Sequence, residues 1–172
     1  FMVRVAGLWD KWEDGINQRD ASGLTVKEQL DEISASAHEQ VKLQYKYMLS
    51  ILKELESNGI RICRVSKISK KGRGWLDEYY REVVYPVLTP MAVDASRPFP
   101  FLANKTLNLA VEIINQDEEQ SMGLVQVPSV LPRLVEVEGE GKRTFVFLED
   151  IIIENCHDLF NGCQILDVVP FR

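Results

Sequence analysis

The stretch LNLAVEIINQDEEQSMGLVQV, residues 107–127, carries two apolar segments on either side of a polar turn. Apolar side chains occupy every second position of residues 107–113, and residues 124–127 begin an apolar return. A period of two is typical of a strand with one buried face, and the polar residues 115–120 fit a turn between two such strands. The stretch therefore predicts a β-hairpin, and with it an antiparallel sheet.

The chain after this hairpin continues with short elements. They are predicted to be strands at 133–137 and 144–147 around the turn Gly139-Glu140-Gly141-Lys142, a helix at 149–159 and a last strand at 165–169. Strands and a helix in this order indicate an α+β domain.

The turn at residues 139–142 does not fit a phosphate-binding Walker loop. Such a loop needs a glycine five residues before the Gly-Lys pair, where Glu136 stands, and a hydroxyl directly after the lysine, where Arg143 stands. The turn also lies between two predicted strands, so no helix N-terminus is available to receive a phosphate. We interpret it as a hairpin turn.

The chain before the hairpins is predicted to be helical. Apolar residues at steps of three or four run from Leu30 to Leu55, after a Thr25/Glu28 capping box and before the stop signal Asn58-Gly59. About 30 residues at ~1.5 Å each make a rod of about 45 Å, which needs a partner helix or spans two lobes. Residues 1–12 and 75–84 are predicted as shorter helices, the first beginning upstream of Phe1 and the second with Trp75, Tyr79 and Val83 on one side. Residues 67–74 are predicted as a basic loop.

Prolines mark the boundary between the two kinds of sequence. Four of them fall within fifteen residues, at Pro86, Pro90, Pro98 and Pro100, which is too many for a helix and predicts an extended connection. We place a domain boundary there, between residues 1–84 and residues 85–172. The fold class is then α+β, with a helical part that contains a long helix followed by an α+β domain with an antiparallel sheet.

The charge balance limits the classes of partner. The net charge of −6 argues against a broad nucleic-acid or anionic-membrane surface. Residues 1–85 carry 14 Lys or Arg and 13 Asp or Glu, whereas residues 86–172 carry 6 and 13, a net −7. No apolar run approaches the ~20 residues needed to cross a bilayer. A soluble protein is expected.

One cluster of cations is a candidate polyanion site. It comprises Lys67, Lys70, Lys71 and Arg73, with Arg61 and Arg64 nearby. Flexible cations close together can hold a phosphate polymer by summed attraction. The alternative, more common for a charge run, is a solvated loop.

The residues alone indicate no catalytic, cofactor-binding or metal-binding site. His38 and His157 lack a neighbouring nucleophile and an acid that would fix the tautomer. Cys63, Cys156 and Cys163 form no CxxC pair and are expected to be buried, reduced thiols, as in the cytoplasm. By this reasoning the chain is a binding or scaffolding unit.

Three stretches together resemble the bacterial-type polyphosphate kinase family. Residues 1–8, FMVRVAGL, look like the end of its first conserved helix, and residues 168–172, VVPFR, resemble a segment late in its middle domain. Residues 85–94, YPVLTPMAVD, followed by 97–104, RPFPFLAN, look like its domain-junction signature, which here contributes Pro98, Phe99, Pro100, Phe101 and Asn104. Similarity at 23–25 and 127–133 extends the resemblance to nearly the whole chain.

The resemblance implies a fragment of a four-domain, dimeric enzyme. Residues 1–84 would be the end of its N-terminal helical domain with a connecting helix, and residues 85–172 its middle (head) domain, truncated at the C-terminal end. The parent would transfer the terminal phosphate of ATP to polyphosphate through a phosphohistidine, with magnesium. The family's catalytic histidine and arginines lie after the position of Arg172, and its adenine-site asparagine lies before Phe1. No catalytic residue is therefore carried over, and neither ATP nor Mg is expected to bind the fragment.

The expected roles are scaffolding, dimerisation and forming walls of the active-site tunnel. The expected partners are the C-terminal catalytic domains of the same polypeptide, a second copy in the parent, and polyphosphate, but not nucleic acid. The expected location is the cytoplasm or the periphery of a membrane. Two departures from the family are Arg97, where histidine is frequent, and the basic residues 67–73, which replace a more acidic stretch. The alternative is a stand-alone interaction, dimerisation or polyanion-binding module related to the kinase.

Overall fold

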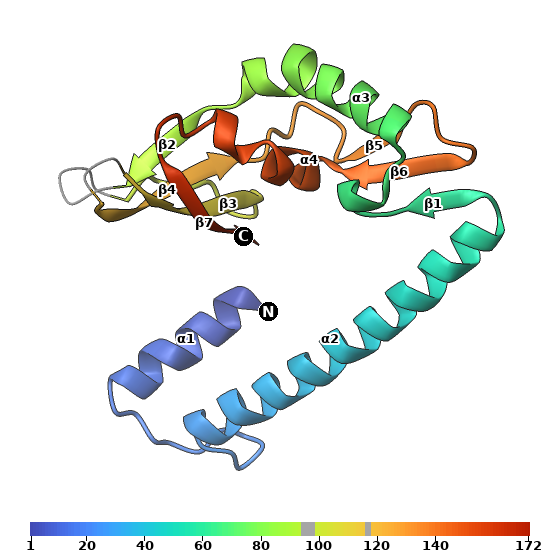
Figure 1. Ribbon diagram of the computed structural model, residues 1–172. Helices are drawn as coiled ribbons and strands as arrows, with labels where there is room; N and C mark the ends of the chain where they lie inside the picture. The colour runs from blue at the N-terminus through green and yellow to red at the C-terminus, as the bar shows by residue number, and fades with distance from the viewer. Residues whose placement is uncertain (94–98, 116–117) are drawn as a thin grey trace. The chain divides into compact units, whose positions relative to one another are not determined.

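The computed structural model describes residues 1–93, 99–115 and 118–172 (Figure 1). By their contacts the residues form two compact units, Phe1–Glu54 and Leu55–Arg172. The α+β class predicted from the sequence is confirmed, because helices dominate the first unit and two sheets form the second.

The first unit consists of helix α1 (Met2–Glu13), a loop and most of helix α2 (Val26–Ser57). The predicted capping box starts α2: the Glu28 carboxylate accepts a hydrogen bond of 2.7 Å from the Thr25 N–H, and the Thr25 hydroxyl accepts one of 3.3 Å from the Glu28 N–H. Gly59, with φ of +83°, follows the end of the helix, where a left-handed residue is favoured. The small core of this unit consists of Leu8, Val26 and Leu30, with Val5 and Ile33 packed against it.

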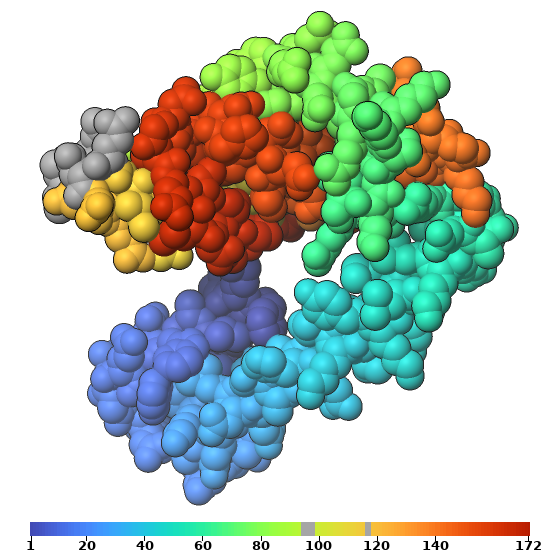
Figure 2. Space-filling view, viewed as in Figure 1, coloured from blue at the N-terminus to red at the C-terminus, as the bar shows by residue number. Residues whose placement is uncertain are grey.

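The second half of α2 leaves its apolar side chains exposed. Exposure is between 45% and 61% for Val41, Leu43, Tyr45, Tyr47, Met48, Leu49 and Ile51. Figure 2 shows this part of α2 at the surface of the molecule. The expectation was that α2 needs a partner helix or spans two lobes. The first unit supplies no partner for this half of α2, since its core ends near Ile33, and the division between the two compact units falls within the helix.

The second unit contains two sheets. The smaller has the order β1-β6-β5, with β1 (Ile60–Ile62) parallel to β6 (Arg143–Phe147) and β5 (Leu134–Val137) antiparallel to β6. The larger is antiparallel and has the order β2-β4-β3-β7, formed by β2 (Pro90–Val93), β4 (Gln120–Gln126), β3 (Asn108–Ile114) and β7 (Gln164–Phe171). Both predicted hairpins, β3-β4 and β5-β6, and the predicted last strand are confirmed.

Two helices complete the core of the second unit. Helix α3 (Lys70–Tyr79) continues as a π-helical turn (Tyr80–Val84) and a 3-10 turn (Tyr85–Val87), and α4 (Leu148–Glu154) precedes a 3-10 turn (Cys156–Asp158). Another 3-10 turn, Val65–Lys67, lies before α3. One core joins the helices to both sheets and includes Leu76, Tyr80, Val84, Leu109, Val111, Val146, Ile151 and Ile152.

Three details of the helices differ from the prediction. Residues 67–74 are not a loop throughout, since α3 begins at Lys70, capped by the Ser69 hydroxyl, which accepts from the Gly72 N–H at 3.2 Å. The buried stripe of α3 and its extension is Leu76, Tyr80 and Val84 rather than the neighbouring Trp75, Tyr79 and Val83. The predicted helix at 149–159 ends at Glu154, after which Asn155 leaves the helical conformation.

The two compact units divide inside α2, whereas the prolines placed the boundary at 84/85. Strand β1 pairs with β6 and α3 contacts β5, so by contacts residues 60–84 belong with the sheets. Part of the proline-rich connection is itself a strand: Pro90 opens β2, which lies at a sheet edge where a missing backbone donor is tolerated.

Candidate functional site

Three segments that are distant in the sequence meet around one cavity of about 420 Å³ in the second unit. Residues 104–107 lead into β3, residues 127–133 connect β4 to β5, and Arg172 follows β7. Its polar lining is Asn104, Lys105, Thr106, Ser129, Arg133 and Arg172, and its apolar lining is Leu107, Val127, Pro128, Leu131 and Leu148. We call it the Arg133 cavity. All three segments overlap or adjoin stretches that carry the family resemblance.

Backbone hydrogen bonds fix the walls of the Arg133 cavity. The Val127 N–H donates to the Leu107 carbonyl at 2.9 Å, and the Leu148 N–H donates to the Arg133 carbonyl at 2.8 Å. These bonds extend the β3-β4 and β5-β6 ladders by one step each, at the strand ends from which the lining segments emerge. The cavity is therefore built on the rigid ends of the two hairpins.

A tight turn presents Lys105 to the cavity. Lys105 has φ of +65°, a left-handed conformation that costs a non-glycine residue about 1 kcal/mol or more. The Thr106 hydroxyl donates to the Ala103 carbonyl at 2.7 Å across the turn. Asn108, which is 2% exposed, donates from its amide to the Thr106 carbonyl at 3.1 Å and hydroxyl at 3.0 Å. Its Oδ1 has no hydrogen-bond partner within the described part of the chain.

Arg133 is held rigidly by a buried carboxylate. Its Nε and Nη2 donate to Glu149 Oε1 at 3.0 and 2.5 Å, and the Glu149 side chain is only 9% exposed. The guanidinium carbon also lies 5.3 Å from the centre of the Phe147 ring. Its hydrogen bonds to Glu149 raise the pKa of Arg133 above its ordinary value. Arg133 is therefore a fixed, permanent cation at the cavity wall.

The candidate basic cluster lies elsewhere in the second unit. Lys67, Lys70 and Lys71 are exposed around the start of α3. Arg73 donates to the Val65 carbonyl at 3.3 Å and lies 3.6 Å from the Glu154 carboxylate. The three lysines therefore have exposed side chains near one another, whereas Arg73 is engaged by the Val65 carbonyl and the Glu154 carboxylate.

The N-terminus of α3 is already filled by a carboxylate. Glu140 Oε1 accepts a 2.9 Å hydrogen bond from the Ser69 N–H, and its other oxygen lies 4.0 Å from Arg61 Nη1. An exogenous phosphate would have to displace this internal anion from the helix terminus. This geometry weakens the candidate cluster as an anion site.

The domain-junction residues are only partly brought together. Pro98 and Arg97 lie outside the described residues. Phe99 and Phe101 are 56% and 99% exposed, and Pro100 is half-buried. Of the motif residues that the structure describes, Asn104 lines the Arg133 cavity.

The histidines lie on the surface. His38 is exposed on α2, with Nδ1 2.7 Å from the Ser34 carbonyl of the same helix. The His157 side chain is 71% exposed and its Nε2 lies 3.2 Å from an Asp158 carboxylate oxygen. The two residues lie in different compact units.

All three cysteines are free thiols, as predicted. The expectation that all three are buried is wrong, because only Cys156 is buried while Cys63 and Cys163 are half-buried. Burial raises the pKa of Cys156 to about 11. In the described ranges no group of three or more His, Cys, Asp or Glu residues could hold a metal ion, and no helix is long and apolar enough to cross a membrane.

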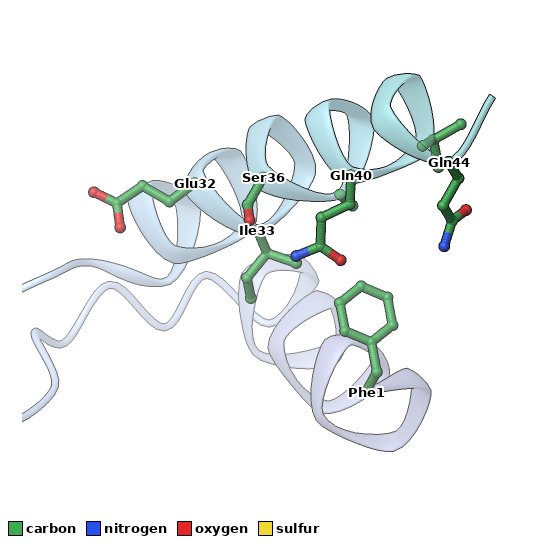
Figure 3. Close-up of a pocket in the computed structure, with 8 residues that line it drawn as sticks. Phe1, Glu32, Ile33, Ser36, Gln40 and Gln44 are labelled. Atoms are coloured by element: carbon green, nitrogen blue, oxygen red, sulfur yellow. The ribbon is translucent and has the colours of Figure 1, made fainter. Parts of the chain in front are cut away.

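A second cavity, of about 470 Å³, lies in the first unit between the start of α1 and α2 (Figure 3). Its apolar lining comes from Phe1, Ile33, Ala37 and Val41. Its polar lining includes the amides of Gln40 and Gln44. Figure 3 shows the Phe1 ring directed toward α2. The lining includes Glu32 but no cation, so this cavity suits an apolar side chain better than a phosphate.

Sequence reasoning did not single out Lys105, Arg133 or Arg172 as site residues. A signal was present, since residues 86–172 contain only six Lys or Arg. Four of those six lie in or beside the segments at 97–104, 127–133 and 168–172 that carry the resemblance. Arg97 lies outside the described residues, and the other three line the cavity.

Two family models match the chain in succession. The model of the polyphosphate kinase N-terminal domain matches residues 1–63, and that of the polyphosphate kinase middle domain matches residues 71–172.

Known proteins resemble the chain along its whole length. A polyphosphate kinase of Bacillus anthracis is 42% identical over 180 residues, covering 100% of this chain and 26% of that protein. One of Halalkalibacterium halodurans is 45% identical over 177 residues, covering 100% and 25%. The crystal structure of polyphosphate kinase from Porphyromonas gingivalis matches with a TM-score of 0.78 and 28% identity, over 96% of this chain and 25% of that one. The chain spans about a quarter of the length of these relatives.

Proposed function

Because this chain belongs to the polyphosphate kinase family, as its N-terminal and middle domains, we propose that it is the scaffolding part of an enzyme that transfers the terminal phosphate of ATP to polyphosphate. The observation that carries the proposal is that both family models match in order and together cover nearly the whole chain. The chain's contribution is to support the active site, to form walls of its tunnel and to take part in dimerisation.

The phosphoryl-transfer chemistry is assigned to sequence outside these 172 residues. A phosphohistidine mechanism needs an imidazole that attacks the γ-phosphate and cations that are fixed around the transferred group. His38 and His157 are exposed, and the oxygens beside them belong to the Ser34 carbonyl and hydroxyl and to the Asp158 carboxylate. Neither histidine has a cation among these neighbours to hold a transferred phosphate. ATP and magnesium are accordingly assigned to the C-terminal domains of a longer polypeptide, with the cytoplasm as the location.

Polymer synthesis tests this proposal. The 172-residue chain and the native polypeptide that contains it are each incubated with γ-labelled ATP and Mg²⁺, and acid-insoluble label is counted. The native polypeptide is expected to make labelled polymer and the chain alone to make none. Polymer made by the 172 residues alone, or none made by the native polypeptide, would contradict the proposal.

A second candidate function is a stand-alone dimerisation module. The exposed apolar side chains between Val41 and Ile51 on α2 favour it, because contiguous exposed apolar surface is typical of interaction sites. Sedimentation equilibrium of the chain, with a Leu49→Glu/Ile51→Glu variant as comparison, tests this function. A dimer that the variant abolishes would support the module, whereas a monomer at all concentrations would count against it.

A further inference from the structure

We propose that the Arg133 cavity binds a segment of the phosphate chain. This inference rests on the proposed function and assigns its polymeric substrate to a site in the middle domain. The candidate cluster at Lys67, Lys70, Lys71 and Arg73 is then not the principal polyphosphate site.

The charged side chains that line the Arg133 cavity are cations. Residues 86–172 carry a net charge of −7 with only six Lys or Arg, yet Lys105, Arg133 and Arg172 all line this one cavity. No Asp or Glu is among the residues that line it. Glu149 offsets the charge of Arg133, so Lys105 and Arg172 give the lining its net positive charge. A cationic cavity in an otherwise acidic half-chain is an attractive site for an anion.

These cations have hydrogen-bonding capacity left over. Within the described residues neither the Lys105 ammonium nor the Arg172 guanidinium makes a hydrogen bond or ion pair, and Arg133 keeps Nη1 free while Nε and Nη2 bind Glu149. Three arginines elsewhere in the second unit are engaged by carboxylates: Arg61 by Glu140, Arg73 by Glu154 and Arg143 by Glu136. Exposed lysines around the start of α3 also have unused donors, but at the cavity three separate segments bring such donors into one lining.

The side chain of one cation and the backbone of another are positioned in advance. Glu149 and the Phe147 ring hold the Arg133 side chain, and the left-handed turn braced by Asn108 holds the Lys105 backbone. Ligand binding then costs less conformational entropy at Arg133 than it would with a mobile side chain. Backbone strain at Lys105 also fits a residue held for a ligand contact.

A phosphate chain suits the lining better than a nucleotide. The three cations come from three different segments, so they can contact successive phosphates of one polymer, and Ser129 and Asn104 add neutral polar groups. The apolar lining is aliphatic and proline, with no aromatic ring on which an adenine could stack. The chemistry recognised is that of linked phosphates, and it requires no base.

The test measures binding of medium-chain polyphosphate to the intact 172-residue chain by titration calorimetry at several salt concentrations. The test variant is Lys105→Gln/Arg172→Gln. The test variant keeps Arg133, because removal of Arg133 would leave the buried Glu149 carboxylate without its ion-pair partner. The matched control is Lys67→Gln/Lys70→Gln, which removes the same charge from the candidate cluster. Circular dichroism and melting temperature confirm that both variants are folded.

The test variant is expected to bind polyphosphate about tenfold more weakly, with a shallower salt dependence, and the control less than about twofold more weakly. ATP and inorganic phosphate are expected to compete poorly with the polymer. Unchanged affinity in the test variant, or an equal loss in the control, would overturn the assignment. Competition by ATP at the same concentration as the polymer would replace it with a nucleotide site.

Failure of the binding test can be distinguished from failure of the polymer-synthesis test of the proposed function. If the native polypeptide makes polymer but the test variant binds polyphosphate normally, only the cavity assignment fails. If the native polypeptide makes no polymer, the proposed function fails, and the binding data still report on the cavity by themselves.

Discussion

Glu140, in the turn between β5 and β6, shows how a single side chain couples two parts of the second unit. Its carboxylate accepts from the Ser69 N–H at the start of α3, 71 residues earlier in the chain, and lies near Arg61. The bond satisfies one of the backbone donors that a helix leaves open at its N-terminus. It also places a negative charge where the helix dipole favours one.

Replacing Glu140 therefore tests this cap. Glu140→Ala is expected to lower the free energy of unfolding by about 1–2 kcal/mol, since a capping hydrogen bond is lost. Urea denaturation measures the change. Glu138→Ala removes an exposed carboxylate from the same turn and is expected to change stability by less than about 0.5 kcal/mol. Equal effects of the two substitutions would show that Glu140 contributes charge to the turn and no cap.

The same bond sets a dependence on pH. The hydrogen bond from Ser69, assisted by Arg61, holds the pKa of Glu140 below its ordinary value. The folded protein therefore binds this proton less readily than the unfolded chain, so the stabilisation is complete above the ordinary pKa of the carboxyl. It is lost as the pH falls through the lowered value. The stability difference between wild type and Glu140→Ala is expected to shrink over that acid range, and a difference that grows there would contradict the geometry.

Two glycines of α3 are expected to respond in opposite ways. A Cβ at Gly72 would lie 2.6 Å from Glu140 Oε1 and 2.7 Å from Ile68 Cγ2, whereas one at Gly74 would meet nothing within 4 Å. Gly72→Ala should therefore destabilise the protein by about 1–3 kcal/mol, and Gly74→Ala should stabilise it by about 0.5–1 kcal/mol. Thermal melts of the two variants measure this, and a loss of stability in Gly74→Ala would show that α3 is packed differently.

Signals within a few neighbouring residues were sufficient to predict some helices and strands and insufficient to predict others. The start of α2 was predictable because Thr25 and Glu28, three residues apart, cap each other. The β3-β4 hairpin was predictable because its alternation is contained in one short stretch. The start of α3 was missed because part of its cap is Glu140, which sequence spacing does not associate with Ser69.

The candidate site depended on long-range structure in the same way. The stretches at 97–104, 127–133 and 168–172 could be recognised individually, but nothing in their spacing says that Asn104, residues of 127–133 and Arg172 line one cavity. The cluster at Lys67 to Arg73 was visible because its charges are consecutive. Its weakness as a site became visible only when Arg73 and the α3 terminus were found to have protein partners.

At the scale of the whole molecule, two divisions of the chain coexist. The family models meet between residues 63 and 71, while the compact units divide between Glu54 and Leu55. The difference arises because β1 belongs to the N-terminal match in sequence but pairs with β6 in space. A cut made between the two family models would therefore remove a strand from the smaller sheet.

The most direct test of the central claim is the location of the phosphorylated histidine. The native polypeptide is incubated with γ-labelled ATP and Mg²⁺, digested under conditions that preserve phosphohistidine, and its labelled peptides are identified by mass spectrometry. The account predicts that label is found on a histidine outside these 172 residues and that His38→Ala/His157→Ala leaves labelling unchanged. Label on His38 or His157, lost in that variant, would contradict it.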